Sequence, residues 1–358
     1  MMKMACKYRA KKSQRFKFII KTFTIKVLQV FFKKRRKWNL TETKPIDLGN
    51  RIFLIDGFDM GFQERTGTYV ICDEQITLVE SCASPSVPHI IKGLETLEIP
   101  LDEIKYIIVT HVHLDHAGGA GLLMQKCPNA KLVVHPRGAR HMIDPSRLIQ
   151  GAKAVYGPIF DKLFDPILPI PEERVIVKHD GETLAIGSDC ELTFYDTPGH
   201  ANHHFSIYDP KSNGIFVGDT LGVKNKHIEE YGFALYLPAT SPNQFDPDKT
   251  MESLQRIRNL GVDRIYFGHF GMAEDVDEVY KQIEHWLPIY VKTGEEVYRE
   301  GKNANELKKR LLDKISAVLD EHSIPKNHIA YQIIQMDLQI FSMGIIDYFS
   351  KKEKSEAK

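Results

Sequence analysis

The sequence predicts an α/β protein in which mixed β-sheets are covered on the outside by helices, and three observations carry this prediction. The chain has 358 residues, of which 42% are hydrophobic and 27% are charged. This composition suits one large or two medium folded domains and excludes a disordered, collagen-like or coiled-coil chain. From about residue 45, short apolar runs bounded by turn residues recur, with helical segments between several of them. After residue 274 the pattern is helical to the end of the chain.

The predicted strands and helices follow one another in an order that fits this architecture. Three closely spaced apolar runs, 51–55, 67–71 and 76–80, are typical of a meander of antiparallel strands. A helix over 88–97 precedes the β-branched strand 104–110. The remaining strands are expected over 131–135, 191–197, 204–209, 215–219 and 263–267, and the C-terminal helices over 276–299, 304–321 and 328–349. The long segment 136–173 is expected to insert a helical lid over one edge of the fold.

These elements divide the chain into a basic N-terminal extension (1–44), a central α/β domain (45–273) and a helical C-terminal region (274–358). Fourteen of the 48 Lys and Arg residues lie in the first 38 positions, with no acidic residue among them. The apolar residues between positions 16 and 31 share one arc of a helical wheel, which predicts a basic amphipathic helix lying on an anionic membrane surface. The alternative is an extension without fixed structure. Lysines interrupt the apolar stretch, so neither a membrane-spanning helix nor a secretory signal is predicted.

The charge of the remaining chain bears on its partners and its compartment. Positions 39–358 carry 34 Lys and Arg against 47 Asp and Glu. Because binding to nucleic acid needs a basic face, no nucleic-acid partner is expected. The five cysteines are odd in number and form no CxxC pair, which argues against a disulfide framework and a thiolate zinc site. We therefore expect a cytoplasmic protein, held at the inner membrane face if residues 1–38 bind lipid.

The clearest chemical signal follows the strand 104–110 directly, where positions 111–116 read HVHLDH. Residues two apart in an extended segment point to the same side, so His111 and His113 can bind one ion. Asp115 and His116 lie at the turn into the following helix and can face a neighbouring ion. A single histidine usually has a structural role, but four metal-competent side chains in six positions at a strand end predict a metal site.

Three later strands each end in a glycine followed by another metal-competent side chain, namely His200, Asp219 and His269. Strand ends are where open α/β sheets place their sites, and glycine lets the backbone come close to an ion. Counting donors gives two sets of three and one carboxylate able to bridge them: His111, His113 and His200; Asp115, His116 and His269; and Asp219. Imidazole and carboxylate ligands without thiolate predict two divalent ions, with Zn²⁺ preferred over Fe or Mn²⁺.

This ligand pattern closely resembles the metallo-β-lactamase-fold hydrolases, over roughly residues 46–272. The resemblance implies a four-layer αβ/βα sandwich, with two mixed sheets face to face, helices outside and a dinuclear site at one edge. Where this family usually has a strand ending in Asp-Thr-Gly, the chain has Glu80, Ser81 and Cys82, so Glu80 would support a ligand. True β-lactamases lack the carboxylate that Asp219 supplies. The glyoxalase II and lactonase branch therefore fits best, with no substrate assigned.

The predicted activity is hydrolysis of an ester, lactone or thioester of a small molecule. Two cations would lower the pKa of a shared water, and the bridging hydroxide would attack the carbonyl. Asp115 is the expected catalytic residue, because it can orient the hydroxide and pass its proton to the leaving group. His203 and His204 are expected to support the ligands, with at most one of them pointing inward. The substrate wall is expected to combine the 136–173 insertion with three residues that follow Asp219: His227, Tyr231 and Tyr236.

Two alternatives from other classes stay open. A mononuclear iron persulfide dioxygenase resembles the same pattern but uses only ligands of the His111, His200 and Asp219 type. A membrane-surface binding module would rely on the basic extension and use the metal structurally. The C-terminal helices leave a homodimer open as well.

Overall fold

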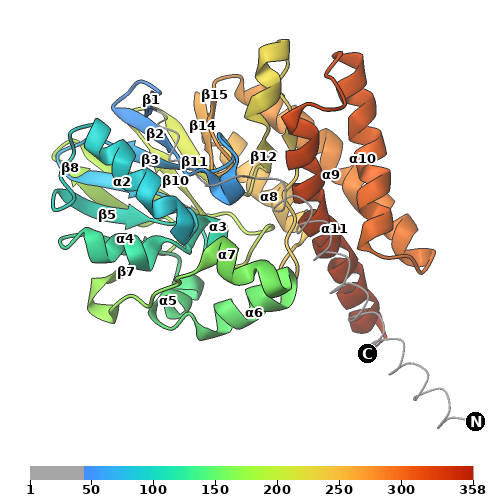
Figure 1. The fold of residues 1–358 in the computed structure, drawn as a ribbon, viewed down its shortest axis with the longest axis horizontal. Helices are drawn as coiled ribbons and strands as arrows, with labels where there is room; N and C mark the ends of the chain where they lie inside the picture. The colour runs from blue at the N-terminus through green and yellow to red at the C-terminus, as the bar shows by residue number, and fades with distance from the viewer. Residues whose placement is uncertain (1–43, 358) are drawn as a thin grey trace, which may run out of the picture.

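The structure is a computed structural model that describes residues 44–357 (Figure 1). The predicted basic amphipathic helix and its membrane contact lie outside the described residues. Two β-sheets pack face to face with helices on their outer surfaces, and a group of long C-terminal helices stands beside one edge of this sandwich (Figure 1). The expected four-layer α/β sandwich with a C-terminal helical extension is therefore confirmed.

The first sheet holds seven strands in sequential order. They are β1 (Ile46–Asp47), β2 (Ile52–Asp56), β3 (Gly67–Ile71), β4 (Ile76–Val79), β5 (Ile104–Ile108), β6 (Lys131–Val134) and β7 (Val175–Val177). Strands β1 to β4 pair antiparallel, as the closely spaced apolar runs predicted, and β4 to β7 pair parallel. The parallel half puts the carboxyl end of β5 at the sheet edge, where the HVHLDH segment begins.

The second sheet has six strands in the order β15-β14-β11-β10-β9-β8. Their bounds are β8 (Thr183–Gly187), β9 (Cys190–Asp196), β10 (Phe205–Asp209), β11 (Gly214–Gly218), β14 (Arg264–Phe267) and β15 (Met272–Ala273). Strand β10 is antiparallel to both β9 and β11, and β11 is parallel to β14. Strands β9, β11 and β14 therefore run in one direction, and their carboxyl ends meet at one edge. A two-stranded ribbon, β12 (Val223–Lys224) with β13 (Tyr236–Leu237), lies outside both sheets.

Alternation of side chains along the strands separates the apolar core between the two sheets from the cores on their outer faces. In β3, Tyr69 points between the sheets, where its ring meets Phe216 of the second sheet at 5.2 Å edge to face. Its neighbour Val70 points to the outer face, which is covered by α2 (Val87–Thr96) and α4 (Ala120–Lys126). The outer face of the second sheet packs against α8 (Pro247–Arg258) and α9 (Val276–Arg299). Each sheet is thus buried on both faces, which fixes the positions of its strand ends.

The segment between β6 and β7 forms α5 (Pro136–Ile143), α6 (Ser146–Tyr156) and α7 (Phe160–Phe164), where a helical lid was expected. Short 3₁₀ turns are η1 (Asp59–Gly61), η2 (Ser84–Ser86), η3 (Gly157–Ile159), η4 (Glu172–Arg174) and η5 (Lys226–Tyr231). The C-terminal helices α9, α10 (Ala304–Glu321) and α11 (Ile329–Glu356) pack on one another around a separate apolar core.

Helix α11 extends seven residues beyond its predicted end. Among the described residues it is the one helix long and apolar enough, by length and composition, to cross a membrane. Two thirds of its most apolar window, however, is buried against other parts of the protein. The helix therefore behaves as a core helix, and its inner face reaches the candidate site.

Candidate metal centre

The HVHLDH segment forms the short connection between β5 and helix α3 (Leu114–Ala117). His113 has an extended backbone and occupies the N-cap of α3, so Asp115 and His116 fall in the first turn of that helix. The chain is extended before the turn and helical after it. The side chains of His111 and His113 therefore point to a different place from those of Asp115 and His116, as the spacing predicted. His111 and His116 are buried, whereas His113 and Asp115 remain partly accessible.

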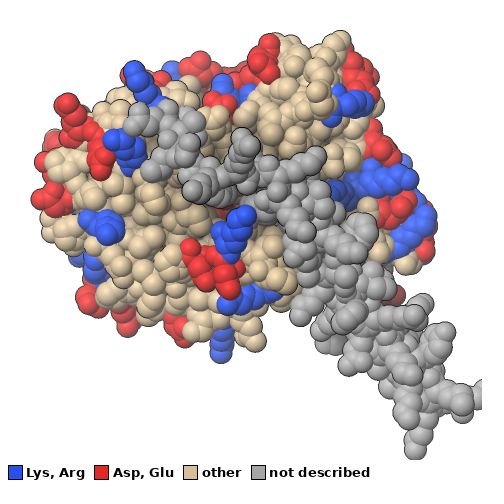
Figure 2. Space-filling view, in the orientation of Figure 1, with Lys and Arg blue, Asp and Glu red and all other residues tan. Residues whose placement is uncertain are grey.

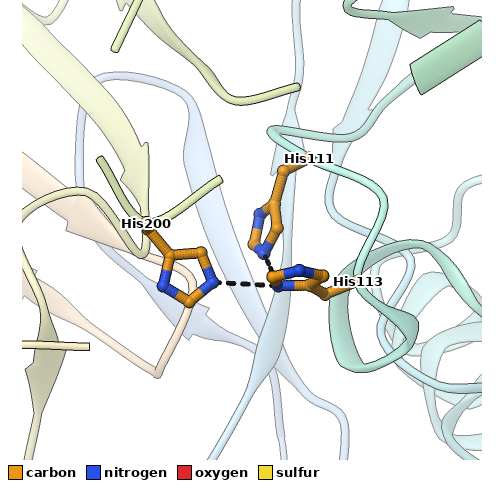
Figure 3. A group of neighbouring side chains, drawn as sticks. All are labelled: His111, His113 and His200. Atoms are coloured by element: carbon orange, nitrogen blue, oxygen red, sulfur yellow. Dashed lines mark hydrogen bonds between the residues drawn. The ribbon is translucent and has the colours of Figure 1, made fainter. Parts of the chain in front are cut away.

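One group of three histidines converges at the sheet edge (Figure 3). His113 Nδ1 lies 3.0 Å from His111 Nε2 and 2.9 Å from Nε2 of His200, which follows β9. The opposite nitrogen of His200 donates to the carbonyl oxygen of Ala239, which fixes its tautomer and its orientation. Three ring nitrogens from two different sheets thus face a common point.

A second group lies next to the first and consists of Asp115, His116 and His269. Asp115 Oδ2 is 3.9 Å from His116 Nε2 and 3.7 Å from His269 Nε2. Asp219 stands between the groups: its Oδ1 is 3.1 Å from His116 Nε2, and its Oδ2 is 3.4 Å from His200 Nε2. The seven residues singled out in the sequence are brought together in the two sets of three with one shared carboxylate.

The polar atoms of this centre fit divalent cations. His116 Nε2 and Asp219 Oδ1 are buried close together, but they lack hydrogen-bond geometry and have no other hydrogen-bond partner among the described residues. Burial and neighbouring imidazoles lower the pKa of His111 and His113, which keeps both rings neutral and able to offer lone pairs. Burial alone would lower the pKa of His116, but the carboxylates of Asp219, Asp115 and Glu80 together outweigh it and raise that pKa. The cluster therefore attracts positive charge at the point where the ligand atoms meet.

Glycines before the ligands give the backbone the close approach that the strand-glycine-ligand pattern indicated. Gly218 has a φ of +48°, and a Cβ at this position would lie 2.5 Å from His204 Nε2. A Cβ on Gly268 would lie 2.5 Å from Cε1 of the His116 ring. Any larger residue at either position would displace one of the histidines around Asp219.

Glu80 occupies the supporting position that was expected of it. Its Oε1 lies 3.3 Å from His116 Nδ1, and the carboxylate also accepts hydrogen bonds from the backbone and hydroxyl of Thr110. Cys82, which stands where the resembling family usually has glycine, adopts a left-handed φ of +52°. The loop therefore keeps a glycine-like shape in spite of the side chain.

Both His203 and His204 lie beside the centre, so the expectation that at most one points inward was wrong. The reason is that they belong to the turn before β10 and not to the strand, so strand alternation does not apply to them. His204 Nε2 accepts a hydrogen bond from the backbone N–H of Asp219 at 3.2 Å, and its ring stacks on His111. His203 packs edge-on against the His113 ring, 5.4 Å between centroids.

A cavity of about 280 Å³ opens over the two ligand groups. Its walls come from α6, α7, the loop at 240–244 and α11. The expected wall from the insertion is thus present, but the three residues expected from the segment after Asp219 do not line this cavity. Tyr236 is buried and stacks on Phe267, and Tyr231 packs against His328 at the start of α11. His227 donates to the carbonyl oxygen of Gln63 beside a separate small cavity.

A buried ion-pair triad at the edge of the cavity was not predicted from the sequence. Arg65, in the loop between β2 and β3, forms ion pairs with Asp59 of η1 and, at 2.7 Å, with Asp337 of α11. Arg65 and Asp337 both line the cavity. The available signal was Asp337 itself, a lone acidic residue in the apolar stretch 333–341, because a charge on such a helix face needs a buried partner.

Comparison with known proteins agrees with this geometry. Residues 67–269 match the family profile described as the metallo-beta-lactamase superfamily. A metallo-beta-lactamase fold-containing protein of Sulfurisphaera tokodaii is 27% identical over 59% of this chain and 75% of its own length. A crystal structure of an archaeal superfamily protein from Sulfolobus tokodaii superposes with a TM-score of 0.58 at 22% identity, covering 82% of this chain and 97% of that one.

Two relatives whose names state an enzyme activity match shorter parts of the chain. A hydroxyacylglutathione hydrolase of Legionella pneumophila is 28% identical over 41% of this chain and 45% of its own length. An atrochrysone carboxyl ACP thioesterase of Aspergillus fumigatus is 26% identical over 50% of this chain and 42% of its own length. The chain therefore spans less than half of either protein.

Proposed function

Because the chain belongs to the metallo-beta-lactamase superfamily, we propose that it is a metal-dependent hydrolase of small-molecule esters, thioesters or lactones. One observation carries this proposal: His111, His113 and His200 on one side, and Asp115, His116 and His269 on the other, converge around Asp219 at the floor of a cavity. The names of the two relatives that match about half of the chain or less, a hydrolase and a thioesterase, support hydrolysis of an acyl bond.

In this proposal the two sets of three side chains hold one divalent ion each, with Asp219 facing both and Zn²⁺ as the preferred metal. Such a pair of ions supplies Lewis acidity and a water whose pKa is lowered toward neutrality. Asp115 is partly accessible and lines the cavity, so its carboxylate can hold the proton of that water and pass it to the leaving alcohol or thiol. Glu80 orients His116 through its Nδ1 atom, and His204 accepts a hydrogen bond from the backbone N–H of Asp219.

The proposal is tested by metal analysis joined to hydrolysis. Protein purified without chelator is expected to carry about two divalent ions per chain by elemental analysis. Dialysis against a chelator is expected to abolish hydrolysis of aryl esters, thioesters and lactones, and added Zn²⁺, Fe²⁺ or Mn²⁺ to restore it. Fewer than about one ion per chain in active protein would contradict the proposal, since the second ligand set would then have no role.

The alternative of a mononuclear iron persulfide dioxygenase uses a single ligand set. The separate group of Asp115, His116 and His269 favours two ions and therefore the hydrolase. Oxygen uptake with glutathione persulfide, together with one iron and no zinc per chain, would favour the dioxygenase instead.

A further inference from the structure

Helix α6 carries an apolar stripe that the rest of the protein covers only in part. Along this helix Leu148, Gly151, Ala152, Val155 and Tyr156 follow the spacing i, i+3, i+4, i+7, i+8, which places them on one face. All five line the cavity over the metal centre. Leu148, Ala152 and Tyr156 pack on one side against the apolar cluster around Phe160 and Phe164, but no residue of α6 is fully buried. A Cβ on Gly151 would meet no atom within 4 Å, so this part of the stripe borders free volume.

The opposite wall of the cavity comes from the other end of the chain. Met336, Ile340 and Phe341 of α11 line it, and Phe164 of α7 closes one side. Neither arginine of the wall is available to a ligand inside the cavity. Arg65 is paired with two carboxylates, and Arg147 is exposed to solvent at the start of α6. The body of the cavity is thus an apolar slot between α6 and α11, with the metal ligands at its floor.

We propose that this slot binds an apolar, unbranched acyl group of the substrate, and that the stripe of α6 sets its length. The inference rests on the proposed hydrolase function and names the substrate class of the same site. A cavity of 280 Å³ is roughly twice the volume of an engineered protein cavity that admits benzene, so it holds about 8 to 12 carbon atoms. In the reaction water adds across the acyl bond, which gives the medium-chain carboxylic acid and an alcohol or thiol.

Chain-length profiles of the metal-loaded protein test this inference. With p-nitrophenyl esters, kcat/KM is expected to rise about two- to fourfold per added methylene from acetate to decanoate, because each methylene leaves water for the slot. It should fall for palmitate, whose 16 carbons exceed the volume. Calorimetric titration with the product anions gives a readout without turnover: sodium decanoate should bind at least about tenfold more tightly than sodium acetate.

Gly151→Leu is the decisive variant, because Gly151 lines the slot and a Cβ there would meet no atom within 4 Å. It should lower kcat/KM for decanoate, and decanoate affinity, at least about tenfold, and leave acetate hydrolysis within about twofold. Ala154→Leu is the matched control, since Ala154 is exposed on the same helix and does not line the cavity. Ile340→Ala removes most of a side chain from the opposite wall and so enlarges the slot. It should move the optimum of the chain-length profile toward longer acyl chains.

The outcomes separate the inference from the proposed function. A flat chain-length profile in an active enzyme, unchanged by Gly151→Leu, would overturn the slot assignment and leave the hydrolase standing. Decanoate binding that is weakened by Gly151→Leu, in metal-loaded protein that cleaves no ester, thioester or lactone, would support the slot and overturn the hydrolase. Equal affinity for decanoate and acetate would overturn the slot whatever the activity.

Discussion

Replacement of Asp219 by asparagine is expected to lower kcat/KM for ester hydrolysis by about 10³-fold or more while leaving the protein folded. The side chain faces both ligand groups, with one oxygen toward His116 and the other toward His200. Asparagine keeps the shape but removes the negative charge that would hold two cations near each other. Stabilisation of transition-state charge by metal ions is worth several kcal/mol, and each 1.36 kcal/mol corresponds to a tenfold change in rate.

The measurement combines steady-state kinetics with elemental analysis, because the variant should also bind less metal. Asp209→Asn is the matched control: Asp209 is equally buried at the end of β10 but pairs with Arg51, away from the centre. That variant should lose stability and keep kcat/KM. The apolar cores between and outside the sheets do not involve Asp219, so Asp219→Asn should unfold cooperatively. Loss of cooperative unfolding would show that the centre is structural.

The largest effect on stability is expected for Arg65→Met. This change leaves Asp59 and Asp337 buried without their shared partner, and breaking a buried ion pair by removing one member costs about 3–5 kcal/mol. Urea unfolding followed by circular dichroism measures the loss. Arg310→Met is the matched control, because Arg310 also pairs with two glutamates, Glu300 and Glu306, but at the surface, where ion pairs contribute little.

The loss should depend on pH in a defined direction. Burial raises the pKa of Asp59 and Asp337, and the Arg65 guanidinium opposes this rise. Without Arg65 both pKa values rise further, so the folded variant keeps protons that the unfolded chain releases near pH 4. Stability of the variant relative to wild type should therefore fall as pH rises, with a larger deficit at pH 8 than at pH 5. A deficit that is constant across this range would contradict the triad as described.

Sequence alone predicted the sandwich and the convergence of the candidate metal-binding residues because both rest on local patterns. The β-branched run at 104–110 identifies β5 wherever it packs, and HVHLDH follows it directly. A glycine precedes Asp219 and another precedes His269, which marks two strand ends that must approach other groups closely. In the structure, Gly218 lies against His204 and Gly268 lies against His116. The two candidate groups could therefore be predicted without knowledge of distances.

The substrate wall could not be assigned in the same way, because an aromatic residue in a loop looks the same whether it faces a cavity or a helix. Tyr231 and Tyr236 lie against His328 and Phe267, and only the placement of α9 to α11 decides this. The stripe of α6 was readable from its helical spacing, but its exposure to the cavity was not. His203 and His204 were misjudged because the strand begins one residue later, at Phe205.

The contact between Arg65 and Asp337 joins residues 272 positions apart and ties the wall of the cavity to the last helix of the chain. Every residue proposed to hold a metal ion precedes α9, so the candidate centre and one wall of its cavity come from separate parts of the chain. A chain without α11 would keep every one of these residues and lose the wall that Met336, Ile340 and Phe341 form. Substitutions in α11 can therefore change which compounds fit the cavity without altering any residue that would hold an ion.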